Sequence, residues 1–208
     1  DGSLFATAGS MVSFDIRAIQ PPEDNSGSTD SGGTSNGQIS SPLDMVLDGD
    51  GGRVTGTDLD DRIFGGAGDD TIDAGAGDDK LLGGQGADHI KAGGGNDRVF
   101  AGRGDQGDDT LEGGSGADLV GGGAGADHID AGGGNDQVFG ATGDDVIIGG
   151  GGNDLIFGGS GNDLVEGGSG DDTVWAGDGN DTMGGGSGAD TFIFGRVSGN
   201  DIITDFDL

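Results

Sequence analysis

Apolar residues recur every nine positions between residues 63 and 192, and an aspartate stands two residues before each of them. Laid out in nines, the chain repeats the form G-G-x-G-x-D-x-U-x, in which U is a large apolar residue. The only break in phase is an insertion of three residues near position 103. An internal period of this kind indicates a repeat architecture before any local propensity is considered.

Fifteen units tile residues 56–193, and the segment Gly199–Ile203 has the form of a half-formed sixteenth. The sixth position is aspartate in all fifteen, whereas the fourth is glycine in every unit except the first, which has Leu59. The last three positions alternate polar, apolar and polar, as a short half-buried strand does. The glycine-rich first positions permit the positive φ angles of a tight turn.

Each unit is therefore a turn followed by a short strand, and two units of nine residues complete one coil. Odd units stack into one parallel sheet and even units into another, with the apolar eighth positions meeting in a thin core. The sequence predicts an all-β fold, a parallel β-roll or β-solenoid of nonapeptide repeats.

Stacking brings the sixth-position aspartate of one unit to about one strand spacing, ~4.8 Å, from that of the next unit but one. Two carboxylates so close repel each other unless a cation lies between them. Calcium accepts six to eight oxygen ligands, including backbone carbonyls, and fits such a site better than magnesium does. The predicted metal ligands are Asp61, Asp70, Asp79, Asp88, Asp97, Asp109, Asp118, Asp127, Asp136, Asp145, Asp154, Asp163, Asp172, Asp181 and Asp190, with Asp201 in the sixteenth unit.

A simpler interpretation is that aspartate and glycine are only turn formers. That interpretation does not explain one fixed phase for aspartate while the neighbouring fifth position varies among Asp, Asn and Ala. The fifth-position acids are expected to be turn or surface residues rather than ligands: Asp69, Asp78, Asp108, Asp144 and Asp171.

The array resembles the calcium-binding nonapeptide of RTX (haemolysin-type) proteins over about two thirds of the chain. The resemblance implies a right-handed β-roll with a row of Ca²⁺ along each edge, bound also by carbonyls from the first four positions. It further implies a secreted bacterial protein, extracellular or at the cell surface, that leaves through a type I secretion apparatus with a C-terminal signal. Because the chain stops at Leu208, where that terminal segment usually begins, we expect a fragment of a longer polypeptide.

Net charge supports a structural role for the ion. The chain has 39 acids, 8 bases and a net charge of −31. Low hydrophobicity with high net charge is typical of chains that do not fold alone. Pairing the fifteen aspartates across turns gives thirteen sites, and thirteen Ca²⁺ would nearly cancel this charge. We expect about 10–13 Ca²⁺ to bind and to contribute folding energy. We expect the fewest ions at 101–112, where the insertion must bulge out or break the ladder.

Composition also excludes several classes of partner and chemistry. Few scattered Lys and Arg argue against nucleic-acid binding. The absence of cysteine excludes disulfides and thiolate sites, and no stretch approaches the length of a membrane span. We predict no catalytic residue and no organic cofactor here.

The flanks are expected to form other parts. Residues 1–20 read as a β-strand remnant of an upstream domain, 21–41 as a flexible linker, 42–55 as an N-terminal cap and 194–208 as the start of a C-terminal cap. Arg103-Gly104-Asp105 is an adhesion-type tripeptide in form, but a loop insertion is the simpler interpretation.

Three functions remain open from the sequence. The first is a calcium-binding module that folds on Ca²⁺ binding after secretion. The second is the non-catalytic tail of a secreted protease, lipase or polysaccharide-modifying enzyme, whose catalytic domain would lie outside this chain. The third is a spacer or assembly element of a surface adhesin or surface-layer protein, with a cell-surface or self-assembly partner.

Overall fold

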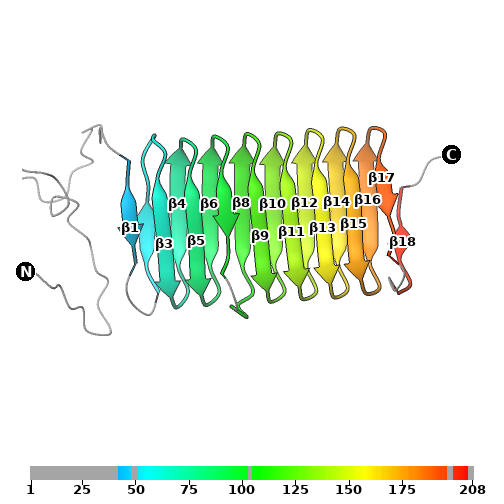
Figure 1. The fold of residues 1–208 in the computed structure, drawn as a ribbon, viewed down its shortest axis with the longest axis horizontal. Coiled ribbons are helices and arrows are strands. Elements are labelled where there is room, and N and C mark those ends of the chain that lie inside the picture. The colour runs from blue at the N-terminus through cyan, green and yellow to red at the C-terminus, as the bar shows by residue number, and fades with distance from the viewer. Residues whose placement is uncertain (1–41, 48–50, 103–104, 196–198, 206–208) are drawn as a thin grey trace, which may run out of the picture. The chain divides into compact units, whose positions relative to one another are not determined.

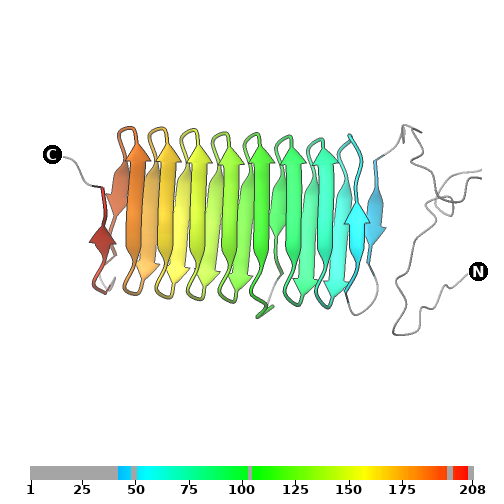
Figure 2. The same ribbon diagram turned by 180° about the vertical axis from the view of Figure 1, so that it is seen from behind.

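The structure is a computed structural model that describes residues 42–47, 51–102, 105–195 and 199–205. Within these residues, eighteen strands form two nine-stranded sheets in which all pairings are parallel. Figures 1 and 2 show the strands stacked side by side along one axis, with successive strands alternating between the two sheets. The predicted all-β parallel roll is confirmed. The segments 1–20 and 21–41, for which a strand remnant and a linker are expected, lie outside the described residues.

One sheet contains the odd-numbered strands and the other the even-numbered strands. The odd strands are β1 (Asp44–Val46), β3 (Arg62–Ala67), β5 (Lys80–Gln85), β7 (Arg98–Phe100), β9 (Leu119–Ala124), β11 (Gln137–Thr142), β13 (Leu155–Ser160), β15 (Thr173–Asp178) and β17 (Thr191–Ile193). The even strands are β2 (Arg53–Thr55), β4 (Thr71–Ala76), β6 (His89–Gly94), β8 (Thr110–Ser115), β10 (His128–Gly133), β12 (Val146–Gly151), β14 (Leu164–Ser169), β16 (Thr182–Ser187) and β18 (Ile202–Ile203).

The register follows from the repeat. Ile129 of β10 pairs with Ile147 of β12, and Val138 of β11 pairs with Ile156 of β13. Each pairing joins residues two nonapeptides apart, so that one coil contains two units as predicted. The eighth-position side chains of the two sheets fill the interior, and those from Ile63 to Met183 are almost fully buried.

The strands are longer than the sequence indicates. β4 and its equivalents run from the seventh position of one unit through the third position of the next. The second position stays in the sheet although Gly75 there has φ +109°. A Cβ on Gly75 would collide with the carbonyl oxygen of Thr57 in the preceding coil. Glycine is therefore needed here for close approach between strands, and only the fourth to sixth positions form the turn.

The outer surfaces of the two sheets differ at the ninth position. In the odd sheet, Phe139 and Phe157 stack with ring centroids 5.0 Å apart, and Phe157 lies 6.0 Å from Trp175. In the even sheet the same position carries charged residues such as Asp130 and Glu166. Cross-strand aromatic pairs of this kind stabilise a sheet.

The segments expected to cap the roll extend its two sheets. β1 and β2 are the first strands of the two sheets, and the neighbouring Leu43 and Leu47 are buried. At the other end β18 adds a short strand, and Ile203 packs partly against the core. Across the part of the chain that the structure describes, no helix is long and apolar enough to cross a membrane.

Candidate metal centre

The sixth-position aspartates end each turn, immediately before a strand begins, with their side chains buried. From Asp79 onward, the Oδ1 atom of each accepts a hydrogen bond from the backbone N–H of the aspartate one coil earlier, whereas Asp61 and Asp70 accept from Leu43 N and Gly52 N. Asp136 N donates to Asp154 Oδ1 at 2.8 Å, and Asp145 N donates to Asp163 Oδ1 at 3.0 Å. The carboxylates thus form one continuous row at each edge of the roll.

The second carboxylate oxygen has no partner along most of each row. Among the described residues, thirteen sixth-position aspartates have a buried Oδ2 without a hydrogen bond. A buried carboxylate oxygen left unpaired is costly, and buried charges are normally paired or bind metals. The thirteen are Asp70, Asp79, Asp88, Asp97, Asp109, Asp118, Asp127, Asp136, Asp145, Asp154, Asp163, Asp172 and Asp181.

Backbone oxygens border the same spaces. A Cβ built on Gly149 would lie 2.7 Å from Asp154 Oδ2 and 2.6 Å from the carbonyl oxygen of Gly167. A Cβ on Gly167 would meet Asp172 Oδ2 at 2.6 Å and the Gly185 carbonyl oxygen at 2.7 Å. Carboxylate and carbonyl oxygens are the ligands that calcium prefers. The residues present therefore fit Ca²⁺, although alanine such as Ala131 takes this first position in some units.

The electrostatics of the row penalise ionised carboxylates without a cation. Burial is the main cause that raises the pKa of Asp136 to about 7; the charges of Asp154 and Asp118 add to it, and the hydrogen bond from Asp118 N opposes it. Burial likewise raises the pKa of Asp145 to about 7, with added repulsion from Asp127 and Asp163. A cation beside these oxygens would favour the ionised carboxylates and so oppose both shifts.

The predicted ligands at the ends of the rows differ from the rest. Both oxygens of Asp61 are already bonded, with Oδ1 accepting from Leu43 N at 2.5 Å and Oδ2 from Thr57 N at 2.6 Å. Asp190 and Asp201 are only partly buried, though each still accepts from the row, at 3.0 and 3.2 Å. The structure thus places all sixteen predicted residues in two rows, in which Asp61 has no free oxygen and Asp190 and Asp201 are more exposed than the rest.

The fifth-position residues form a second ladder, which the sequence did not predict. They lie exposed in the turns, and their side-chain oxygens accept from the backbone N–H one coil later, opposite in direction to the buried row. Asp144 Oδ1 accepts from Asn162 N at 2.7 Å, and Asn162 Oδ1 accepts from Asn180 N at 3.0 Å. Asp and Asn serve equally as acceptors, and Ala117 and other alanines can still donate through the backbone. Because Asp and Asn both accept this hydrogen bond, and alanine still donates one, all three residue types occur at the fifth position.

The insertion does not interrupt the buried row. Asp88 N donates to Asp109 Oδ1 at 2.7 Å, and Asp97 N to Asp118 Oδ1 at 2.8 Å, across 21 residues instead of 18. The buried row therefore keeps its register across the three extra residues. Asp105 in this segment is also buried, and no sequence pattern singled it out as a ligand because it lies outside the nonapeptide phase.

Comparison with known proteins agrees with this geometry. The RTX calcium-binding nonapeptide repeat (4 copies) matches residues 55–90, 77–105, 103–138, 130–165 and 157–192. No curated protein matches the chain. Repeats of this family bind multiple Ca²⁺ in a non-catalytic β-roll. On this match and this fold, the chain belongs to the family of RTX calcium-binding nonapeptide repeats.

Proposed function

We propose that the sixth-position aspartates hold Ca²⁺ between the coils, and that the chain folds when it meets calcium outside the cell. The ligands would be the thirteen aspartates with a free Oδ2, with Asp61, Asp190 and Asp201 completing the rows at their ends. Export through a type I secretion apparatus, as is usual for the family, would deliver the unfolded chain to calcium. The buried, unpaired Oδ2 atoms are the single observation that carries this proposal.

Ion binding has the magnitude needed to control folding. A site occupied at a hundred times its Kd contributes about 2.7 kcal/mol. Ten such sites would contribute about 27 kcal/mol, which exceeds the net stability of about 5–15 kcal/mol typical of a domain. Without the ions, the same carboxylates oppose folding by mutual repulsion, and the net charge of −31 adds to this. The module would therefore act as a calcium-dependent folding element.

Far-UV circular dichroism tests the proposal. In EGTA we expect a spectrum of a disordered chain, and at roughly millimolar Ca²⁺, a level matched to extracellular sites, a β-rich one. Magnesium at the same concentration should have little effect, because it requires rigid octahedral geometry and retains its waters. A β-rich spectrum that chelation leaves unchanged would contradict the proposal.

A further inference from the structure

The insertion sits at one defined place in the coil. The backbone at Gly102 lies against Gly84 of the preceding coil, and Gly107 lies against Gly86. Between these two contacts the sequence has four residues where the preceding coil has the single residue Gln85. The coil above and below keeps its register, so the insertion changes one turn only.

Asp105 takes the place of a backbone carbonyl in that turn. In regular turns the N–H of the fourth position donates to the third-position carbonyl one coil later, as Gly134 N does to Gly151 O at 2.6 Å. At the insertion, Gly86 N instead donates to Asp105 Oδ1 at 3.2 Å. Gly107 N donates to the same oxygen at 3.1 Å. Two backbone groups thus hold the carboxylate in a fixed orientation.

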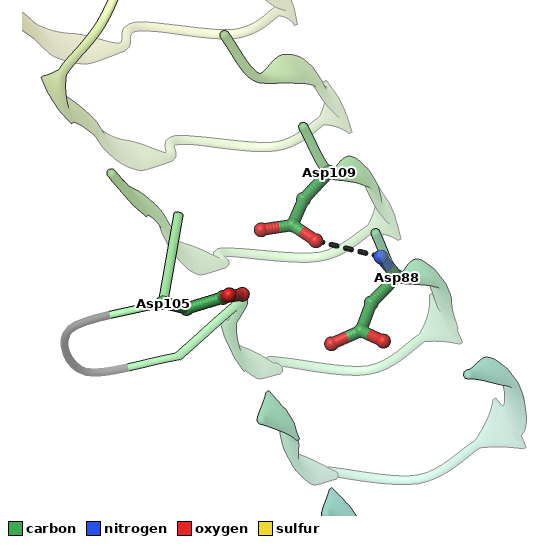
Figure 3. Close-up of side chains that lie close together, drawn as sticks. All are labelled: Asp88, Asp105 and Asp109. Atoms are coloured by element: carbon green, nitrogen blue, oxygen red, sulfur yellow. Dashed lines mark hydrogen bonds between the residues drawn. The ribbon is translucent and has the colours of Figure 1, made fainter. Parts of the chain in front are cut away.

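The Asp105 carboxylate lies close to two carboxylates of the buried row. Asp105 is 4% exposed, and its Oδ2 has no hydrogen-bond partner, as is also true of Asp88 and Asp109. One oxygen from each of the three residues lies within 4.8 Å of the others. Figure 3 shows the Asp105 carboxylate directed toward the carboxylates of Asp88 and Asp109. Within the described residues this is the only such group of three acids.

We infer that the insertion builds a cation site of its own, in which Asp88, Asp105 and Asp109 place three carboxylates around one calcium ion. The inference rests on the proposal that cations lie between the coils, and it assigns to this turn a ligand that the nonapeptide does not supply. Calcium affinity in oxygen sites is set by ligand charge and rigidity. A third charge, held by two N–H groups, makes this the tightest site of the roll.

The site also lies beside the shortest strand in the interior of the roll. β7 contains three residues, and it pairs with β5 and β9 through three positions each, whereas most neighbouring strands pair through five. The sequence led us to expect the fewest ions here because the insertion must bulge out or break the ladder. The continuous bond from Asp88 N to Asp109 Oδ1 removes that reason. A tightly held ion would join the coils on either side of the short strand.

Asp105→Asn tests the inference, with Asp178→Asn as its matched control. Asp178 is an acid at the third position of a regular unit, at the end of β15, but it is exposed, and only its backbone carbonyl accepts a hydrogen bond from the preceding coil. Both variants lose one charge and keep the shape of the side chain. Equilibrium dialysis against chelator-buffered calcium, starting from the calcium-loaded protein, counts the ions that remain bound as free calcium falls.

We expect the wild type and Asp178→Asn to retain one last ion at calcium levels about tenfold or more below those needed by Asp105→Asn. Equal retention by all three proteins, or an equal loss in both variants, would overturn the inference while leaving calcium-dependent folding intact. In wild-type crystals grown with calcium, an anomalous peak in contact with Asp105 Oδ2 is expected. A map with ions in neighbouring turns and none there would also overturn it. Absence of any calcium response would instead contradict the proposed function.

Discussion

Replacing Asp154 should destabilise the calcium-loaded roll more than replacing Asp61. The informative substitution is Asp→Asn at each position. In Asp154→Asn, the amide oxygen can still accept from Asp136 N, as Oδ1 does at 2.8 Å, and the change removes the charge and the free Oδ2. Asp61 has no free oxygen to lose, since Leu43 N and Thr57 N already bind its carboxylate.

The expected magnitudes follow from the number of ions each carboxylate serves. Asp154 lies between Asp136 and Asp172 in its row, so its loss affects the sites on both sides. At a free calcium concentration a hundred times the Kd of one site, losing two sites costs about 5 kcal/mol. Asp61→Asn affects at most one site and a hydrogen bond, which together amount to at most about 4 kcal/mol.

Urea unfolding at fixed calcium, followed by circular dichroism and Trp175 fluorescence, measures both losses. The calcium concentration at the folding midpoint should rise only about twofold for Asp154→Asn, because the lost free energy is spread over all the remaining ions. An Asp61→Asn variant destabilised as much as Asp154→Asn would refute the stacked-row account of these sites.

Three further predictions concern pH, the core and the backbone. Because burial raises the folded pKa of Asp136 and Asp145 to about 7, above the ordinary 3.8, ionisation disfavours the metal-free fold as pH rises from about 4 to 7, and protonation favours the fold as pH falls from 7 to 6, so that the calcium midpoint of folding should fall over the same range; a midpoint that rises as pH falls would contradict this. Ile147→Ala should lower the free energy of unfolding in urea at saturating calcium by about 2–5 kcal/mol, and Ile148→Ala, at an outward position, should lower it far less. Equal losses would contradict the placement of the eighth position in the core. Ala141 has φ +86°, which is strained for a residue with a Cβ, so Ala141→Gly should raise the free energy of unfolding by about 0.5–1 kcal/mol in the same assay. A lower free energy of unfolding would contradict backbone strain at this position.

The periodic features of the fold could be predicted from the sequence. Ile147 and Ile156 lie two residues after an aspartate, and this spacing placed both in the core and both aspartates in the turns. A period of nine with side chains alternating along a strand leaves few other arrangements. For the same reason, the carboxylate rows follow from the fixed phase of the sixth position.

The remaining features depend on contacts between coils, which a single unit does not reveal. From the sequence Gly75 is expected in a turn, but it lies within β4. Glycine is needed there because the carbonyl of Thr57 in the preceding coil leaves no room for a Cβ. The acceptor role of Asp144 becomes visible only when the N–H of Asn162 is placed above it. Asp105 lies outside the repeat, and its closeness to Asp88 becomes visible only when the two coils are stacked.

The most direct test of the account is a crystal structure of the calcium-loaded chain with anomalous scattering from the ions. The account predicts about ten to thirteen calcium ions in two rows, each ion bound at about 2.3–2.6 Å by the Oδ2 atom of a sixth-position aspartate. It also predicts that Asp154 contacts ions on both of its sides. Fewer than about six ions under calcium-rich conditions, or ions bound on the outer faces while these Oδ2 atoms stay free, would contradict it.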